Sequence, residues 1–370
     1  MTRQINFTDV NQIKKNHQKR INSRILNIIK KKNFILGREV YDFEKKFSKM
    51  SKSKFSIGCA SGTDALVLAL KSLNINSNDE VIVPGVTYIS TGLSVILNNS
   101  KLVLTDIDNE TGLIDINKIK NKITKKTKAV IPVNLYGEKV DLKRLREVVG
   151  NKIFIIEDSA QSHFAFSKNN KKIIENKHAD VSCYSFYPAK NLGAYGDGGL
   201  VSVNSKYLYK KLLALRNLGS IEKNRHFLKG MNSRLDTLQA VVLRSKLNTA
   251  LELNSKRRKI AEYYDEHLSK IKKVKLTRTS KGSSRHLYVI RVRNRNKLIN
   301  YLQKKKISCQ IHYPYSLNKL KAFMNKIKKV RLKNSERWAR ECLSLPMHPN
   351  LSINDARTIV NSIKRYFKAL

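Results

Sequence analysis

The sequence predicts an α/β protein with a mostly parallel sheet flanked by helices. Short apolar runs typical of strands alternate with helical patterns, which favours β-α-β units. One run, residues 153–156, is apolar at every position, as expected for a strand buried on both faces of a parallel sheet. A chain of 370 residues is long for one core, so we expect a large domain over residues 1–250 and a smaller α+β domain over residues 251–370.

The predicted elements of the large domain follow from apolar periodicity and from the residues that begin or end helices. Gly37 separates two helix candidates. We predict helices over residues 11–31, 39–50, 65–73, 114–123, 142–149 and 206–217, a helix from residue 87, and strands over residues 54–59, 81–84, 102–105, 129–133, 153–156, 181–186 and 199–203. Residues 219–230 are expected to form an irregular basic loop.

The second domain is predicted to mix helices with a few strands. Helices between residues 232 and 268 are expected to connect it to the large domain. Strands are predicted over residues 285–292 and 308–312, and helices over residues 294–306, 335–343 and 355–370.

One lysine lies in an unusual setting. Lys190 follows the strand candidate 181–186 and precedes a segment, 193–199, with four glycines, where the backbone can turn tightly and approach a ligand. A desolvated lysine loses part of its preference for the charged form, so its amine can form a Schiff base with a carbonyl. The alternative is a solvated lysine in a glycine-rich turn.

Acidic and hydrogen-bonding residues follow the strand candidate 153–156. The segment 157–163 reads Glu-Asp-Ser-Ala-Gln-Ser-His, and it begins at the carboxyl end of that strand, where ligands bind in open α/β sheets. A lysine after one strand and a carboxylate after another are the groups that a pyridoxal phosphate site requires, because the lysine carries the aldehyde and the carboxylate keeps the pyridine nitrogen protonated. The two segments therefore predict such a site.

Two further features are compatible with this site. Residues 61–64, Ser-Gly-Thr-Asp, begin the helix 65–73, and the free N–H groups at a helix N-terminus attract an anion such as phosphate; the alternative is an ordinary helix cap. Tyr88 lies at a strand-to-helix turn, from which its ring could stack on a flat ligand. The alternative is a tyrosine of the core.

The formal net charge of +46, from 74 basic and 28 acidic residues, is the most unusual feature of the composition. Such a charge favours contact with polyanions. The lysines are nevertheless spread along the whole chain, and the sequence has no zinc-finger spacing, RRM pattern or KH loop. We therefore expect no specific nucleic-acid partner.

The cysteines and the apolar runs exclude several other classes. The four cysteines are far apart, which argues against a zinc site and against a disulfide framework. No apolar run approaches the roughly 20 residues of a membrane span, and the N-terminus has no signal-peptide core. We expect no metal, no membrane partner and a cytoplasmic location.

Several motifs together resemble a known family. The segments 157–163 and 185–199 occur with 61–66, 83–88, 231–240, 312–314 and 345–349 in the order found in the DegT/DnrJ/EryC1/StrS family. Its members are pyridoxal-phosphate-dependent aminotransferases that act on keto sugars carried by nucleotides. The resemblance extends from residue 34 to the C-terminus, and it implies the aspartate-aminotransferase type of fold, fold type I.

The resemblance implies roles for individual residues at the cofactor. Lys190 would bind the aldehyde and then move a proton as general base and acid. The remaining cofactor contacts would come from Asp158 at the pyridine nitrogen, Gln161 at the ring hydroxyl, Tyr88 over the ring face, and Gly62, Thr63 and Ser185 at the phosphate.

Further implied contacts involve a second subunit and the substrate. Asn232 matches an asparagine that the partner subunit provides in the family, which implies a homodimer with shared sites. Substrate contacts are expected from His163, Arg234, His312 and Tyr313, with a structural role as the alternative for His163.

The implied activity moves an amino group from L-glutamate, through the pyridoxamine phosphate form of the cofactor, to a dTDP- or UDP-linked 3-keto or 4-keto-6-deoxyhexose in surface-polysaccharide or amino-sugar biosynthesis. One alternative is a relative that uses the cofactor for sugar dehydration or deoxygenation, although the dehydratase members replace the lysine by histidine. The other is a basic nucleic-acid-binding protein that keeps the fold without the chemistry. Phe164, Ala189 and Leu218 stand where the family usually has glycine, glycine and histidine.

Overall fold

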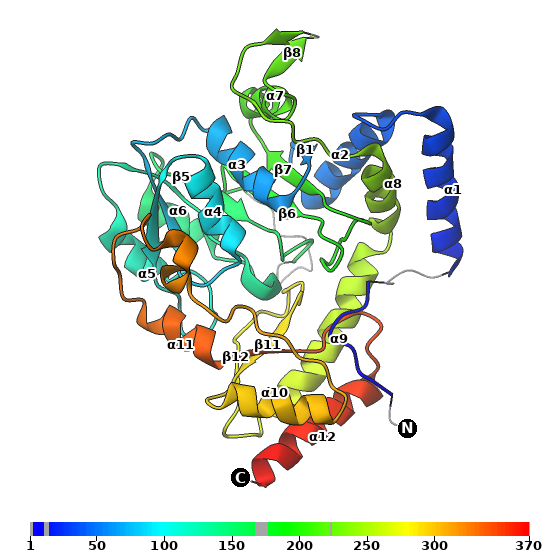
Figure 1. The fold of residues 1–370 in the computed structure, drawn as a ribbon, viewed down its shortest axis with the longest axis vertical. Helices are drawn as coiled ribbons and strands as arrows, with labels where there is room; N and C mark the ends of the chain where they lie inside the picture. Colours follow the sequence, from blue (N-terminus) through cyan, green and yellow to red (C-terminus); the bar gives the residue numbers. More distant parts are fainter. Residues whose placement is uncertain (1–2, 11–14, 167–176, 223, 370) are drawn as a thin grey trace.

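A seven-stranded sheet forms the centre of the larger part of the molecule (Figure 1). The computed structural model describes residues 3–10, 15–166, 177–222 and 224–369. The strand order is β1-β7-β6-β5-β4-β2-β3, and β7 alone runs antiparallel to its neighbours. The strands are β1 (Phe55–Cys59), β2 (Glu80–Pro84), β3 (Lys101–Thr105), β4 (Thr127–Val130), β5 (Phe154–Asp158), β6 (Val181–Ser185) and β7 (Gly199–Val203). The predicted α/β class with a mostly parallel sheet is confirmed.

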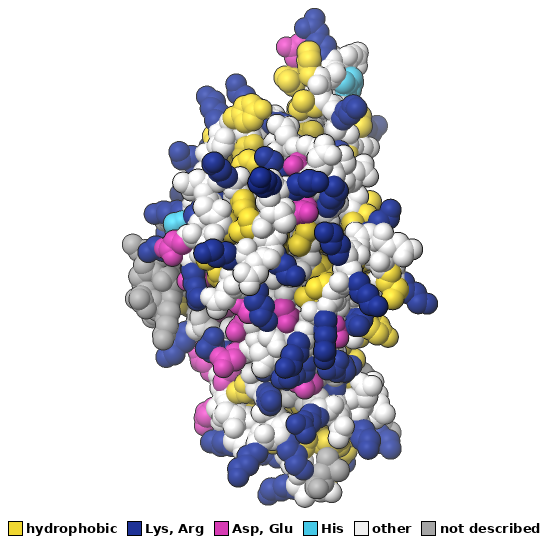
Figure 2. Space-filling model, turned by 90° about the vertical axis from the view of Figure 1, so that its left-hand side faces the viewer, with side chains coloured by type: hydrophobic (Ala, Val, Ile, Leu, Met, Phe, Trp, Pro, Cys, Tyr) yellow, Lys and Arg dark blue, Asp and Glu magenta, His cyan; other side chains and the backbone are white. Residues whose placement is uncertain are grey.

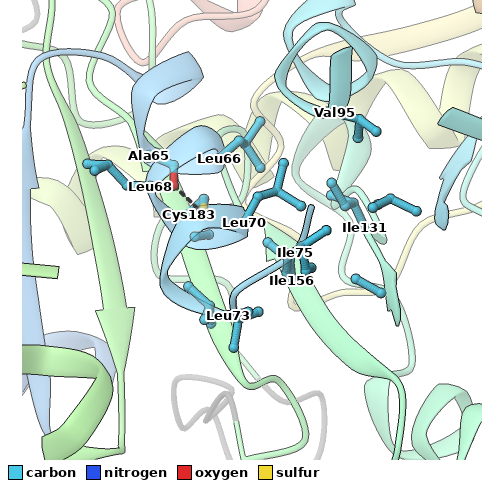
Figure 3. Packing of buried hydrophobic residues seen from close by; sticks show 14 of the residues in the cluster. Ala65, Leu66, Leu68, Leu70, Leu73, Ile75, Val95, Ile131, Ile156 and Cys183 are labelled. Atoms are coloured by element: carbon cyan, nitrogen blue, oxygen red, sulfur yellow. Dashed lines mark hydrogen bonds between the residues drawn. The ribbon is translucent and has the colours of Figure 1, made fainter. Parts of the chain in front are cut away.

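Helices cover both faces of this sheet. Side chains alternate along each strand, so apolar side chains have to be buried on both faces. Cys183 of β6 faces α3 (Gly62–Ser72) and its Sγ donates to the carbonyl of Ala65 at 3.4 Å within the apolar core shown in Figure 3. Tyr184, the next residue, packs on the other face against Phe47 of α2 (Arg38–Ser51). The remaining helices of this part are α1 (Lys15–Lys31), α4 (Ile89–Leu97), α5 (Ile116–Ile119), α6 (Leu142–Val149), α7 (Lys206–Leu215) and α8 (Thr237–Lys246).

A smaller three-stranded antiparallel sheet lies in the lower half of Figure 1. It consists of β10 (Lys275–Leu276), β11 (Tyr288–Arg291) and β12 (Cys342–Leu345), and its helices are α9 (Ala250–Leu268), α10 (Arg295–Lys304), α11 (Lys333–Glu341) and α12 (Ile353–Lys368). The N-terminal segment joins this part, because Ile5 forms a bridge with Ile307. Phe323, from the C-terminal part, packs in the core of the large sheet. The division at residue 250 stays a prediction.

Most predicted elements lie where expected, and the differences are local. The predicted strand over 308–312 is wrong, since this segment makes only an isolated bridge at Gln310. The expected irregular loop 219–230 contains a short hairpin, β8 (Ser220–Glu222) and β9 (Arg225–His226). The first four residues of the predicted helix 11–31 lie outside the described residues. The short edge strands β10 and β12 were not predicted.

A buried ion pair joins α2 to β1 and to the C-terminal end of α7. The Arg216 guanidinium donates to the Glu44 carboxylate and, at 2.8 Å, to the carbonyl of Gly58, whose N–H donates to Glu44 at 2.7 Å. The side chains of Arg216 and Glu44 are 8% and 7% exposed. Burial raises the pKa of Glu44, against the opposing attraction of Arg216. Either charge of this pair would destabilise the fold if its partner were removed, because it would stay buried without compensation.

We expect Arg216→Ala to lower the free energy of unfolding by about 3–5 kcal/mol, because the substitution leaves the buried Glu44 carboxylate without its partner. Urea unfolding measures the change. Lys256→Ala is the control: its 3.3 Å ion pair with Glu252 is half exposed, and the expected loss is below about 1 kcal/mol. Equal losses in the two variants would contradict this account of Arg216.

Candidate active site

Lys190 lies in the loop that connects β6 to β7, at the carboxyl edge of the large sheet. The loop is closed by two backbone hydrogen bonds of 2.8 Å, from Ala194 to Phe186 and from Lys190 to Tyr187. Lys190 keeps part of its surface open. Desolvation nevertheless lowers the pKa of its amine to about 8, against the attraction of Asp158, which raises it. A larger share of the amine is therefore uncharged near neutral pH than in a solvated lysine.

Asp158 is the last residue of β5, the strand next to β6. One carboxylate oxygen accepts a hydrogen bond from the Thr91 hydroxyl at 2.9 Å, and the other accepts one from the Ala160 N–H at 3.1 Å. Burial raises the pKa of Asp158, while these hydrogen bonds and Lys190 oppose the rise. A buried carboxylate with open lone pairs fits a protonated ring nitrogen, because such a pair satisfies both charges.

The N-terminus of α3 and the end of β6 form a cradle for an anion. A Cβ atom added to Gly62 would lie 2.6 Å from the Cβ of Ser185, so only glycine allows this approach. Ser61 caps the helix by accepting from the Asp64 N–H at 3.1 Å. The other N–H groups of a first helical turn have no partner inside the helix, so those of Gly62 and Thr63 are suited to hold a phosphate.

Gln161 and two tyrosines lie on the other side of the candidate site. The Gln161 side chain accepts from the Tyr136 N–H at 2.7 Å and donates to the Tyr313 hydroxyl at 3.0 Å. The ring of Tyr313 lies 5.7 Å from the ring of Tyr88, which is 55% exposed at the start of α4. Tyr88 is thus free to meet a flat ligand. The donor set of lysine, carboxylate, helix N-terminus and exposed aromatic ring fits pyridoxal phosphate.

The two predicted histidines make contacts of different kinds. Neither ring nitrogen of His163 has a well-formed hydrogen bond within the described part of the chain, and its ring packs against those of Tyr184 and Phe186. Burial and the charge of Lys190 lower its pKa to about 3, against a weak contact to the Ser185 backbone. His312 bonds the Ser344 hydroxyl at 2.9 Å. Both roles in substrate binding stay predictions.

Arg234 and Asn232 lie on the segment that leads into α8. Arg234 donates to the side chain of Asn217 at 3.1 Å, and the side chain of Asn232 is exposed. Ser233, between them, donates to Asp64 at 2.6 Å and accepts from the Ala60 N–H at 3.2 Å. The segment is therefore attached beside the N-terminus of α3.

Several residues near this site were not predicted from the sequence. Thr91 holds Asp158 from α4, while Asn191 and His286 bond each other at 3.0 Å behind the lysine loop. Glu157, next to Asp158, forms a 2.5 Å ion pair with Lys139. Burial raises the pKa of Glu157, but the charge of Lys139 and hydrogen bonds from Lys139, Asn134 and Ser182 outweigh it, so its net shift is downward. The sequence offered one signal for Thr91: it lies four residues, about one helical turn, after Thr87.

Metal ligands and membrane spans were sought over the described ranges. These ranges hold no group of three or more His, Cys, Asp or Glu side chains that could bind a metal ion. No helix among them is both long enough and apolar enough to cross a bilayer. On the face in Figure 2, Lys and Arg side chains are scattered over the whole surface with a few acidic residues between them.

Known proteins resemble the whole chain. The model of the DegT/DnrJ/EryC1/StrS aminotransferase family matches residues 15–364. A dTDP-3-amino-3,6-dideoxy-alpha-D-galactopyranose transaminase from Aneurinibacillus thermoaerophilus is 38% identical over 364 residues, which cover 98% of this chain and 99% of the relative. The crystal structure of DesV from S. venezuelae in complex with a ketimine intermediate has a TM-score of 0.94 at 32% identity and covers 99% of both chains.

A second solved structure contains a cofactor. The structure of NtdA from Bacillus subtilis with bound cofactor PMP has a TM-score of 0.92 at 26% identity and covers 100% of this chain and 86% of that chain. The fold and these likenesses define the class of protein, an aminotransferase with the fold type I architecture. The chain belongs to the DegT/DnrJ/EryC1/StrS aminotransferase family.

We expect the Lys190 amine of the cofactor-free protein to titrate near pH 8. Acylation by an amine-reactive reagent, followed for the Lys190 peptide by mass spectrometry, should reach half its maximal rate there. Because the Asp158 carboxylate favours the charged amine, Asp158→Asn should move the midpoint lower. A midpoint near the ordinary lysine pKa of about 10.4, or one that rises in the variant, would contradict the prediction.

Proposed function

We propose that the protein is a pyridoxal-phosphate-dependent aminotransferase that moves an amino group from L-glutamate to a nucleotide-linked keto sugar. The observation that carries this proposal is the pair formed by Lys190 and Asp158 at the carboxyl edge of adjacent strands, with opposite pKa shifts caused by burial. Opposite shifts of a base and an acid are typical of catalytic pairs. The family relatives support the same reaction class.

When bound, pyridoxal phosphate supplies an aldehyde that captures amines and a ring that accepts electrons from a neighbouring C–H bond. The chain holds and orients this group. Gly62, Thr63 and Ser185 would bind the phosphate, and Asp158 would keep the ring nitrogen charged. Lys190 would hold the aldehyde and, once its amine is released, would move a proton as general base and acid.

Other residues would orient the cofactor ring. Gln161 is placed for the ring hydroxyl, since its amide already bridges the Tyr136 N–H and the Tyr313 hydroxyl. Tyr88, exposed at the start of α4, would stack on the ring. For the substrate, we assign contacts to His163, Arg234, His312 and Tyr313, as the family resemblance implies. The named activity of the relative from Aneurinibacillus thermoaerophilus favours a dTDP-linked 3-keto-6-deoxyhexose over a UDP-linked or 4-keto sugar.

The active form that we propose is a homodimer with shared sites, in which Asn232 of one subunit completes the phosphate site of the other. Phe34, Ile35 and Leu36 are consecutive large apolar residues that are 43%, 47% and 38% exposed. The segment lies beside the one that carries Asn232, because Thr237 donates to the Phe34 carbonyl at 2.9 Å. Exposed apolar patches of this kind mark interaction sites, and a second copy of the chain would cover this one.

Absorption spectroscopy tests the reaction class. The protein supplied with pyridoxal phosphate should show the visible band of a lysine-bound cofactor, and L-glutamate should convert it to the spectrum of pyridoxamine phosphate. Lys190→Ala should not form the band, because it lacks the amine, whereas Lys304→Ala, on the surface, should behave as the wild type.

Each departure from this spectral result has a defined meaning. The absence of the band in the wild-type protein would refute the aminotransferase assignment and favour a basic binding protein, whose affinity for DNA would fall steeply with salt. A band that ignores glutamate would refute the proposed donor. A normal band in Lys190→Ala would refute the role of Lys190.

Mixed dimers test the shared site. Lys190→Ala and Asn232→Ala should each be inactive alone, but unfolding and refolding them together in equal amounts should restore about a quarter of the wild-type activity, because half of the dimers are mixed and each has one intact site. Asn78→Ala, an exposed loop variant, should be active alone. No recovery in the mixture would show that Asn232 serves its own subunit.

A further inference from the structure

Backbone contacts alone make the loop that carries Lys190 compact. The hydrogen bond from Ala194 to Phe186 joins its ends, and the turn from Tyr187 to Lys190 lies inside it. A Cβ atom on Gly193 would lie only 2.2 Å from the Pro188 carbonyl oxygen. Backbone contacts thus define the shape of the loop, but they do not fix how the loop sits relative to the rest of the site.

Asn191, the residue after Lys190, makes side-chain contacts that fix the lysine loop against the rest of the site. Asn191 is 5% exposed. Its amide nitrogen donates to the Asn254 side chain at 2.7 Å and to the Ser284 carbonyl at 2.8 Å, and its oxygen bonds the Nδ1 of His286 at 3.0 Å. Both donors and one acceptor site of the amide are therefore used.

The partners of Asn191 come from the C-terminal part of the chain and also hold the loop after β5. Asn254, on α9, donates to the His163 carbonyl at 2.8 Å. The Ser284 hydroxyl donates to the Gln161 carbonyl at 2.9 Å. Asn254 is 1% and Ser284 0% exposed. The same buried residues thus join the lysine loop to the loop that follows Asp158.

We propose that Asn191 is a positioning residue for Lys190: its amide, held by Asn254, Ser284 and His286, fixes the lysine loop against the loop of Asp158 and ties both to the C-terminal part of the chain. This inference rests on the proposed function of Lys190. Asn191 itself does not touch the reacting atoms, so its effect is on where the amine lies.

The position of the Lys190 amine can be followed through its pKa, because the protonation states of the neighbouring groups are defined. Because the Asn191 nitrogen donates to two acceptors, its oxygen must accept from His286, whose Nδ1 therefore carries the proton. Burial and neighbouring cations keep the pKa of His286 well below its usual value, and burial also lowers the pKa of His163 and His312. Asp158 is then the charged group that acts on Lys190, and its effect depends on the distance between them.

Asn191→Ala is the central test, with Asn98→Ala as its matched control. Asn98 is also buried and its amide donates two hydrogen bonds of 2.8 Å, to Ile75 and Ser100, away from the lysine loop. Both variants should lose thermal stability, since each leaves buried carbonyl or hydroxyl groups without partners. Only Asn191→Ala should change the lysine.

Two measurements on the full-length protein freed of cofactor report on the lysine directly. In Asn191→Ala, the pH midpoint of Lys190 acylation should shift by about one unit toward the ordinary lysine value. Desolvation is the larger influence on this pKa, so the gain of solvent outweighs the weaker attraction of a more distant Asp158. Covalent capture of pyridoxal phosphate should slow about ten- to a hundredfold, as expected for a misplaced reacting group. Affinity for pyridoxamine phosphate, which has no aldehyde to react with lysine, should stay within about threefold, because it depends on the other cofactor contacts.

The outcomes separate positioning from simple stabilisation. Unchanged acylation and capture in Asn191→Ala, or an equal loss of pyridoxamine phosphate affinity, would overturn the proposal. If Asn191→Ala does not fold, Asn254→Ala breaks the same network from α9 and should shift the midpoint in the same direction. A wild-type protein that captures no pyridoxal phosphate would refute the proposed function instead, and the acylation midpoint would still decide whether Asn191 positions the lysine.

Discussion

The adjacency of β5 and β6 is the constraint on which the candidate site depends. The two strands are parallel, and Asp158 pairs with Cys183, so the carboxylate and the loop that carries Lys190 leave the sheet side by side. The antiparallel β7 then brings the glycine-rich segment back across the same edge, next to β1 and the N-terminus of α3. Residues from four separate segments therefore meet at one edge of the sheet, and long-range side-chain contacts such as those of Asn191 join the loops that carry them.

Burial at this edge has different consequences for two neighbouring carboxylates. Glu157 points to one side of β5, where Lys139, Asn134 and Ser182 compensate its charge, and its pKa is lowered despite its burial. Asp158 points to the other side, where fewer partners oppose burial and its pKa is raised. The alternation of side chains along a strand thus assigns one carboxylate to the structure and leaves the other available for a cationic ring.

The sequence identified the parts of the site that have local signals and missed those that do not. The apolar run before Asp158, the glycines after Lys190 and the small residues that begin α3 each predict their setting from a few neighbours. Asn191 offers no such signal, because its partners lie 63 and 93 residues away. The strand predicted over 308–312 failed for the converse reason. Local alternation was present, but the segment forms only an isolated bridge at Gln310 and a backbone hydrogen bond from Ser308 to Ile5.

The large positive charge acts at a different range from the chemistry of the site. Basic side chains are dispersed over the surface seen in Figure 2, and their fields are screened over about 8–10 Å at physiological salt. The Lys190 amine is instead governed by its own desolvation and by Asp158, which lie inside the protein where screening is weak. The net charge of +46 therefore acts on approaching anions, whose association is accelerated by long-range attraction. The protonation of the lysine depends instead on the packing of two loops.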